Sequence, residues 1–91
     1  MEFDWNVEKN ELLKITCNIS FEMVLNEISE GRVLEDTPHP NSEKYPNQFI
    51  FVVKMNGYCY LVPYVQNTNT IFFKTIIPSR KMMKKYKGVY Q

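Results

Sequence analysis

The dipeptide Asn56-Gly57 constrains the fold more than any other feature of this chain. It lies between two runs rich in β-branched and aromatic residues, at positions 48–55 and 58–65. Asn-Gly is the preferred pair for a two-residue type I′ turn, because both central residues need a positive φ. The two runs are therefore predicted to form neighbouring antiparallel strands, in a register that places Met55 opposite Tyr58 and Phe49 opposite Tyr64.

Two further strands are predicted on either side of this hairpin. One runs over residues 70–77 and ends at Pro78, because proline lacks the N–H that a sheet ladder requires. In its simplest register Tyr60 neighbours Thr75. The other is a short strand over 33–37, which precedes a proline-rich loop.

Side chains alternate along a strand, so the predicted sheet has two unlike faces. One face is uniformly apolar except for a lysine, and we assign it to the helices. The other keeps three tyrosines, whose hydroxyl groups suit a partly hydrated surface. The first face carries Ile50, Val52, Cys59, Leu61, Phe72, Lys74 and Ile76. The second carries Phe49, Phe51, Val53, Tyr58, Tyr60, Val62, Tyr64, Phe73 and Thr75.

Two helices are predicted before the sheet. The first covers residues 7–16, with Asp4 or Asn6 as its N-cap. The second covers residues 21–30 and begins after the N-cap Ser20. Its apolar residues follow the i, i+3, i+4, i+7 pattern of one buried stripe, namely Phe21, Val24, Leu25 and Ile28.

A short basic helix is predicted to start at Ser79, directly after the last strand. Five of the eight residues at positions 80–87 are positively charged and none is acidic. The first turn of a helix normally favours acidic residues, so cations there create a place for an external anion. The alternative is a solvated basic surface with no ligand.

The chain of 91 residues is long enough for one domain with a modest core. We expect a single α+β domain over residues 1–91, in which two N-terminal helices pack on a small antiparallel β-meander of about four strands. The short basic helix completes this expected architecture at the C-terminus.

Charge is divided unevenly along the chain. All ten acidic residues lie at or before Glu43, and eight of the eleven basic residues lie after it. The C-terminal half is therefore suited to nucleic acid or an acidic protein. No apolar run reaches membrane-spanning length and the N-terminus is acidic, so we expect a cytoplasmic protein without a membrane segment.

The composition offers no obvious metal or cofactor site. Cys17 and Cys59 are isolated, and His39 is the one residue that could join them at a metal. We therefore expect two free thiols, no metal and no cofactor.

Three short motifs at the two ends of the chain resemble those of a known family. The start, Phe3-Asp4-Trp5-Asn6-Val7-Glu8-Lys9-Asn10 and then Ile19-Ser20-Phe21-Glu22, is similar to F-x-W-D-x-x-K-x-x-x-N and G-V-S-F-E-E. The end, Ile76-Ile77-Pro78-Ser79-Arg80-Lys81, is similar to I-I-S-A-R-R. These are motifs of BrnT-type toxins of bacterial toxin–antitoxin pairs. The chain departs from them at Asn18-Ile19, in place of G-V, and at Thr75, where the family often has a basic residue.

The resemblance implies a fold of the RelE/ParE-like superfamily and the toxin of a type II toxin–antitoxin system. Such a toxin is an endoribonuclease that cleaves mRNA, free or on the ribosome, and inhibits translation. Its expected partners are RNA and a cognate DNA-binding antitoxin, and homo-oligomers within that complex stay an open alternative. Arg80 matches the arginine of the family's strand–helix junction directly.

Metal-independent RNA cleavage needs a base for the ribose 2′-OH, an acid for the leaving oxygen and a cation for the phosphoryl oxygens. Arg80 is predicted to supply the cation, because its planar fork binds phosphate at two points. His39 and Tyr60 are the candidate acid–base groups, although a loop histidine and a strand tyrosine are more often structural. The predicted RNA-binding residues are Lys74, Lys81, Lys84, Lys85 and Tyr86.

The competing interpretation is a small non-catalytic module that binds nucleic acid or an acidic protein through its basic C-terminal helix. The two classes differ in the part played by Arg80. A nuclease would lose turnover without it, whereas a binding module would lose affinity gradually as each lysine is removed.

Overall fold

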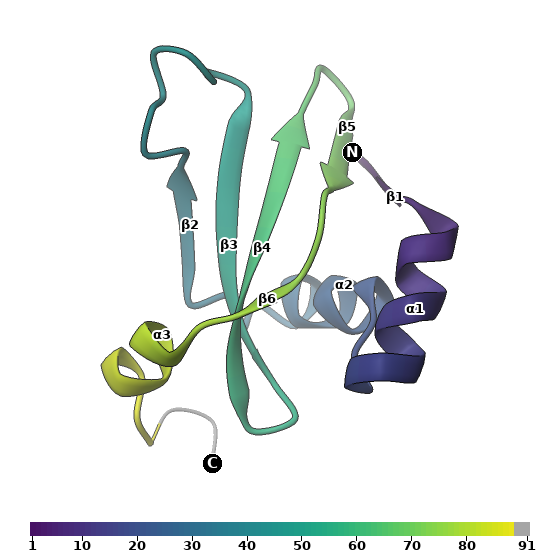
Figure 1. Cartoon of the computed structure of the whole chain (residues 1–91). Helices are drawn as coiled ribbons and strands as arrows, with labels where there is room; N and C mark the ends of the chain where they lie inside the picture. The colour runs from purple at the N-terminus through teal and green to yellow at the C-terminus, as the bar shows by residue number, and fades with distance from the viewer. Residues whose placement is uncertain (89–91) are drawn as a thin grey trace.

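The computed structural model describes residues 1–88 as three helices and a six-stranded mixed sheet (Figure 1). The elements follow in the order β1 (Glu2–Trp5), α1 (Val7–Cys17), α2 (Phe21–Ser29), β2 (Glu35–Pro38), β3 (Gln48–Met55), β4 (Tyr58–Gln66), β5 (Thr70–Phe73), β6 (Ile77–Pro78) and α3 (Arg80–Lys85). The strand order is β1-β5-β4-β3-β2, and β6 pairs with β4 beyond the end of β5. None of the helices in these residues is long and apolar enough to cross a membrane.

The class is α+β, but the predicted architecture of two N-terminal helices on a four-stranded antiparallel meander is wrong. The chain opens with β1, an edge strand that the sequence analysis missed, and α1 and α2 follow it. β1 runs parallel to β5, so the sheet is mixed. β1 has only four residues and pairs with a strand near the other end of the chain. No local sequence pattern therefore predicts it.

The predicted central hairpin is confirmed in both turn and register. Asn56 and Gly57 have φ values of 52° and 76°, as a type I′ turn requires. Met55 lies opposite Tyr58 along the β3–β4 ladder. The short strand before the hairpin begins two residues later than predicted, at Glu35, and extends to Pro38 at the edge of the sheet, where proline is tolerated.

The predicted last strand is interrupted. After β5, pairing with β4 continues to Lys74, whose N–H donates to the Pro63 carbonyl at 2.8 Å. Pairing resumes at β6 with Ile77 opposite Leu61. Two residues of the returning strand thus lie opposite the single residue Val62, which is the arrangement of a β-bulge. The simple register that placed Tyr60 beside Thr75 is therefore wrong.

The bulge decides which of two adjacent isoleucines is buried. The extra residue reverses the alternation, so Ile76 shares the face of Phe73 and joins the core. Ile76 is 5% exposed and Ile77 is 43% exposed. The bulge therefore turns the residues just before α3 outward.

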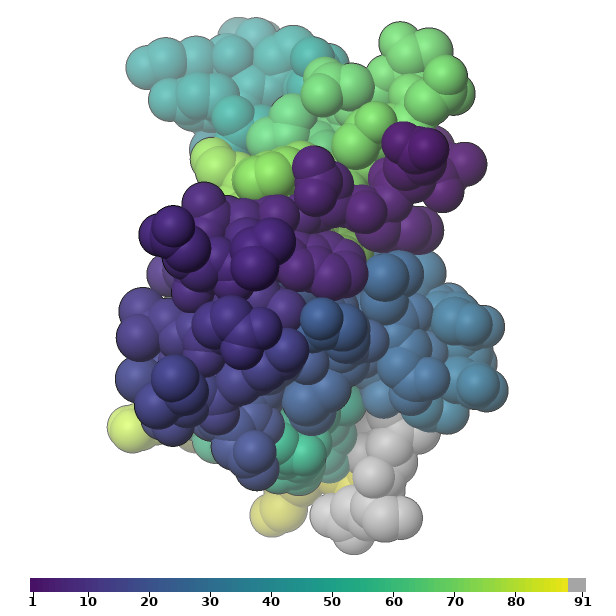
Figure 2. All heavy atoms as spheres, turned by 90° about the vertical axis from the view of Figure 1, so that its right-hand side faces the viewer, coloured from purple at the N-terminus to yellow at the C-terminus, as the bar shows by residue number. Residues whose placement is uncertain are grey.

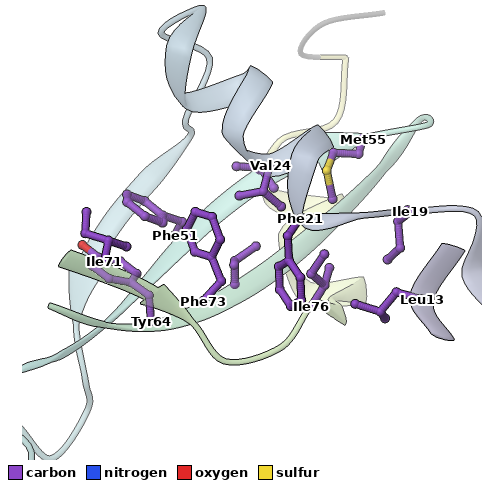
Figure 3. Close-up of a cluster of buried hydrophobic side chains, with 12 residues drawn as sticks. Leu13, Ile19, Phe21, Val24, Phe51, Met55, Tyr64, Ile71, Phe73 and Ile76 are labelled. Carbon is purple, nitrogen blue, oxygen red and sulfur yellow. The ribbon is translucent and has the colours of Figure 1, made fainter. Parts of the chain in front are cut away.

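The core lies between α1, α2 and one face of the sheet. Figure 3 shows Phe21 and Val24 of α2 directed toward the sheet, where they meet Phe51 and Phe73. This is the face that we expected to be partly hydrated, so the assignment of the two faces is wrong. Tyr64 shows the reason: its hydroxyl donates to Asp36 at 2.5 Å, which lets a ring only 2% exposed be buried without an unpaired polar group.

Both predicted N-terminal helices are present and capped by their own side chains. Asn6 and Ser20 accept hydrogen bonds from backbone N–H groups in the first turns of α1 and α2. The buried Asn10 joins the two helices, because its carbonyl oxygen accepts from the Phe21 N–H at 2.8 Å while its amide donates to Glu22 at 2.7 Å.

The outer side of α1 is largely exposed. The side of the molecule in Figure 2 is formed mainly by β1, α1 and α2, the purple to blue segments. Leu12 and Ile15 are 55% and 83% exposed, whereas Leu13 is buried. Leu13 is thus the α1 side chain in the buried core, and the two hydrogen bonds of Asn10 join the helix to α2.

Because of the bulge, alanine substitution should lower the free energy of unfolding by different amounts at the adjacent positions 76 and 77. Ile76→Ala should lower the free energy of unfolding by about 2–5 kcal/mol, because it leaves a cavity in the core. Ile77→Ala should change it by only about 0.5 kcal/mol, since that side chain is largely in solvent. Urea unfolding of both variants measures this difference, and equal losses would contradict the bulge.

Candidate nucleic-acid interface

α3 is fixed to β4 by the backbone of Ser79 and by the side chain of Met83. Ser79 caps the helix as predicted, accepting from the Met82 N–H at 3.3 Å, and its own N–H donates to the Cys59 carbonyl at 2.9 Å. The Met83 sulfur lies 3.0 Å from the Cys59 nitrogen. α3 consequently lies on the face of the sheet turned away from α1 and α2 (Figure 1).

The face on which α3 lies is here named the open face. Beyond α3 its apolar side chains are only half-buried: Ile50, Leu61, Pro63, Val65 and Phe72. Lys74 lies exposed at the far side of this face, where its ammonium donates to the side-chain Oε1 of Gln48 at 3.4 Å. The predicted RNA-binding lysine of the last strand is therefore on the same face as α3, but at the other end of β4.

The cations of α3 fall on two sides of the helix. Lys81 and Lys85, one turn apart, face β2, where Glu35 contacts Lys85. Arg80 and Lys84, also one turn apart, are exposed and form no ion pair within residues 1–88. On one side of α3 the charge of Lys85 is thus paired with Glu35, whereas the other side is available to an external anion.

Glu35 is the carboxylate that ties α3 to β2. One of its oxygens lies 2.5 Å from the Lys85 ammonium and 2.5 Å from the Tyr86 hydroxyl. The hydrogen bonds from Lys85 and Tyr86, followed by the charges of Lys85 and Lys81, lower the pKa of Glu35 below its usual value. The same contact raises the pKa of Lys85 and of Tyr86.

The sequence analysis did not identify Glu35, and it assigned Tyr86 a role in RNA binding instead of a contact with this carboxylate. Tyr86 was expected to stack on bases, but its hydroxyl is held by Glu35 and its ring is half-buried. The two residues are 51 positions apart, so no spacing in the sequence brings them together. The one available signal was that Glu35 lies on a predicted strand and is among the last three acidic residues before a C-terminal half without any.

The three predicted catalytic residues do not converge. Arg80 begins α3, whereas the half-buried Tyr60 packs against the core on the opposite face, where burial raises its pKa. His39 lies in the β2–β3 loop at the far end of the sheet (Figure 1). Its Nδ1 accepts from the Asn41 N–H at 2.9 Å and its ring lies 4.6 Å from that of Tyr45. His39 therefore has the contacts of a loop-stabilising residue.

Two open pockets lie outside this surface, and one of them, of about 450 Å³, is lined by Lys74 and the start of α1. The other pocket, of about 390 Å³, lies between α2 and the tip of the β3–β4 hairpin. Its two carboxylates are already engaged, since Glu22 accepts from Asn10 at 2.7 Å and Glu27 from Arg32 at 2.9 Å. Among residues 1–88, no three His, Cys, Asp or Glu side chains are grouped so as to hold a metal ion.

Comparison with known proteins adds no further constraint. No protein-family model matches the sequence, and no curated protein or solved structure matches it significantly. The resemblance to BrnT-type toxins therefore stays a prediction from short motifs, and functional argument depends on the geometry of α3 and the open face.

The Glu35 contact predicts an acid-sensitive contribution to stability. Because the pKa of Glu35 is lowered on folding, its contribution is complete above the ordinary value of 4.5 and is lost as the pH falls through the lowered value. At pH 7 the wild type should melt roughly 2–4 °C above Glu35→Gln. Thermal unfolding of both proteins from pH 7 to 3 tests this, and a gap that does not narrow as the pH falls would contradict it.

Proposed function

We propose that this protein binds single-stranded RNA through α3 and the open face. The observation that carries the proposal is that Arg80 and Lys84 are exposed without an ion pair in residues 1–88. Cations left unpaired on one side of a helix attract the phosphate backbone, and release of its counterions supplies much of the affinity. Lys87 follows in the same basic segment and is also exposed.

The geometry favours single strands over a duplex. α3 has six residues, so it is only about 9 Å long and contributes few side chains to a groove. The half-buried apolar residues of the open face offer a surface on which unpaired bases can lie, and Phe72 is the aromatic ring among them. An acidic protein is the competing partner, because the same charges would attract it.

A second candidate function is the endoribonuclease toxin that the motifs at both ends of the chain imply. Arg80 supports it, because an exposed guanidinium can stabilise the charge on a phosphoryl group. Since His39 and Tyr60 lie elsewhere, this activity needs acid–base groups from other residues or from the ribosome. In this proposal the protein acts in the cytoplasm, and its cognate antitoxin covers α3 or the open face.

RNA binding predicts a graded response to the loss of charge. Arg80→Ala and Lys84→Ala should each weaken binding of a fluorescent single-stranded RNA about fivefold at 0.1 M salt, and each should reduce the salt slope by about 0.7. Fluorescence anisotropy at several salt concentrations measures both quantities. Lys44→Ala is the matched control, because this exposed cation lies in the β2–β3 loop, far from α3. Equal losses in all three variants would refute the assigned surface.

The toxin proposal predicts cleavage that does not need a metal ion. Purified wild-type protein should cleave a labelled mRNA in EDTA, and Arg80→Ala should lower the rate by about 10²-fold or more, since it removes charge stabilisation in the transition state. The assay is run with and without ribosomes. If neither condition gives cleavage while the RNA is bound, the protein is a binding module.

A further inference from the structure

We propose that Lys81, Lys85 and Tyr86 form a phosphate subsite that the carboxylate of Glu35 occupies in the absence of RNA. This inference rests on the proposed RNA binding and concerns its regulation. It makes Glu35 an internal competitor of the nucleic acid, so that Lys85 and Tyr86 are occupied in the resting protein while Arg80 and Lys84 are not.

The contacts of Glu35 are those that a phosphate oxygen would make. The Lys85 ammonium and the Tyr86 hydroxyl both donate to the same carboxylate oxygen, at 2.5 Å each. Donation from an ammonium and a hydroxyl to one anionic oxygen is a short, charge-assisted arrangement that phosphate also favours. The charge of Lys81 acts on the same carboxylate, because it also lowers the pKa of Glu35.

The subsite can be reached from solvent. The side chain of Lys85 is 56% exposed, while that of Glu35 is only 18% exposed beneath it. An RNA strand lying along Arg80 and Lys84 would pass the other side of the same short helix. Within residues 1–88, Glu35 is the carboxylate in hydrogen-bond contact with this segment.

RNA phosphate and the Glu35 carboxylate would compete for the subsite because both are negatively charged. Two anions cannot share one ammonium and one hydroxyl hydrogen without strong repulsion at close range. RNA must therefore avoid the subsite or displace Glu35 from it. Displacement would also release the side-chain link between α3 and β2, because Glu35 is the residue through which that link is made.

The first experiment removes the charge of Glu35 while keeping its shape. Glu35→Gln should tighten binding of the fluorescent RNA about fivefold at 0.1 M salt and steepen the salt slope by about 0.7, because one more phosphate contact becomes available. Asp36→Asn is the matched control. It removes the same charge from the next residue, but Asp36 bonds to Tyr64 on the opposite face of the sheet and should change binding much less.

A double-mutant comparison tests the subsite without relying on one variant. Lys85→Ala should weaken binding less than Lys84→Ala in the wild type, because Lys85 is already paired with Glu35. In the Glu35→Gln background the two alanine variants should lose affinity equally. Circular dichroism and thermal unfolding establish that each variant is folded before it is compared.

Three outcomes of these binding experiments distinguish the subsite from the proposed RNA binding itself. Tighter binding by Glu35→Gln alone, with the background-dependent effect of Lys85→Ala, supports the subsite. If the wild type binds RNA but Glu35→Gln behaves like Asp36→Asn, the subsite is refuted and the proposed function stands. If no variant binds RNA at any salt concentration, the proposed function and this inference both fail.

Discussion

The structure depends first on the packing of Phe73. This ring is fully buried and lies within 5.7–6.3 Å of four other aromatic rings, measured between centroids. Its neighbours are Phe3 and Trp5 of β1, Phe21 of α2 and Phe51 of β3. Aromatic pairs of this kind add to the energy of area burial. One side chain near the C-terminus thus joins the first strand, a helix and the central hairpin.

The position of α3 follows from what happens directly after Phe73. The bulge changes the register of the returning strand, so that Ile76 is buried with the core and β6 crosses toward the opposite face. Ser79 then starts a helix in which Met83 lies against β4 while Arg80 and Lys84 remain exposed. The basic surface is therefore presented by the same packing that closes the core, and Glu35 fixes its orientation.

Local features of the sequence predicted the parts of the fold that local interactions control. The turn at Asn56-Gly57, the β3–β4 register and the caps Ser20 and Ser79 all depend on residues within a few positions of one another, and all are confirmed. The buried face was predicted wrongly, because tyrosine content was taken as a sign of hydration. Whether a tyrosine can be buried depends on a partner for its hydroxyl, and Tyr64 finds one in Asp36 on a different strand.

The sequence by itself determined the hairpin, the helix starts and the separation of acidic from basic residues along the chain. Tertiary structure alone decided the pairing of β1 with β5, the choice of core face and the contact of Glu35 with Lys85 and Tyr86. The physical reason is sequence separation. A turn or a cap is stabilised by its own neighbours, whereas these contacts join residues about 50–70 positions apart and form only once the whole sheet has assembled.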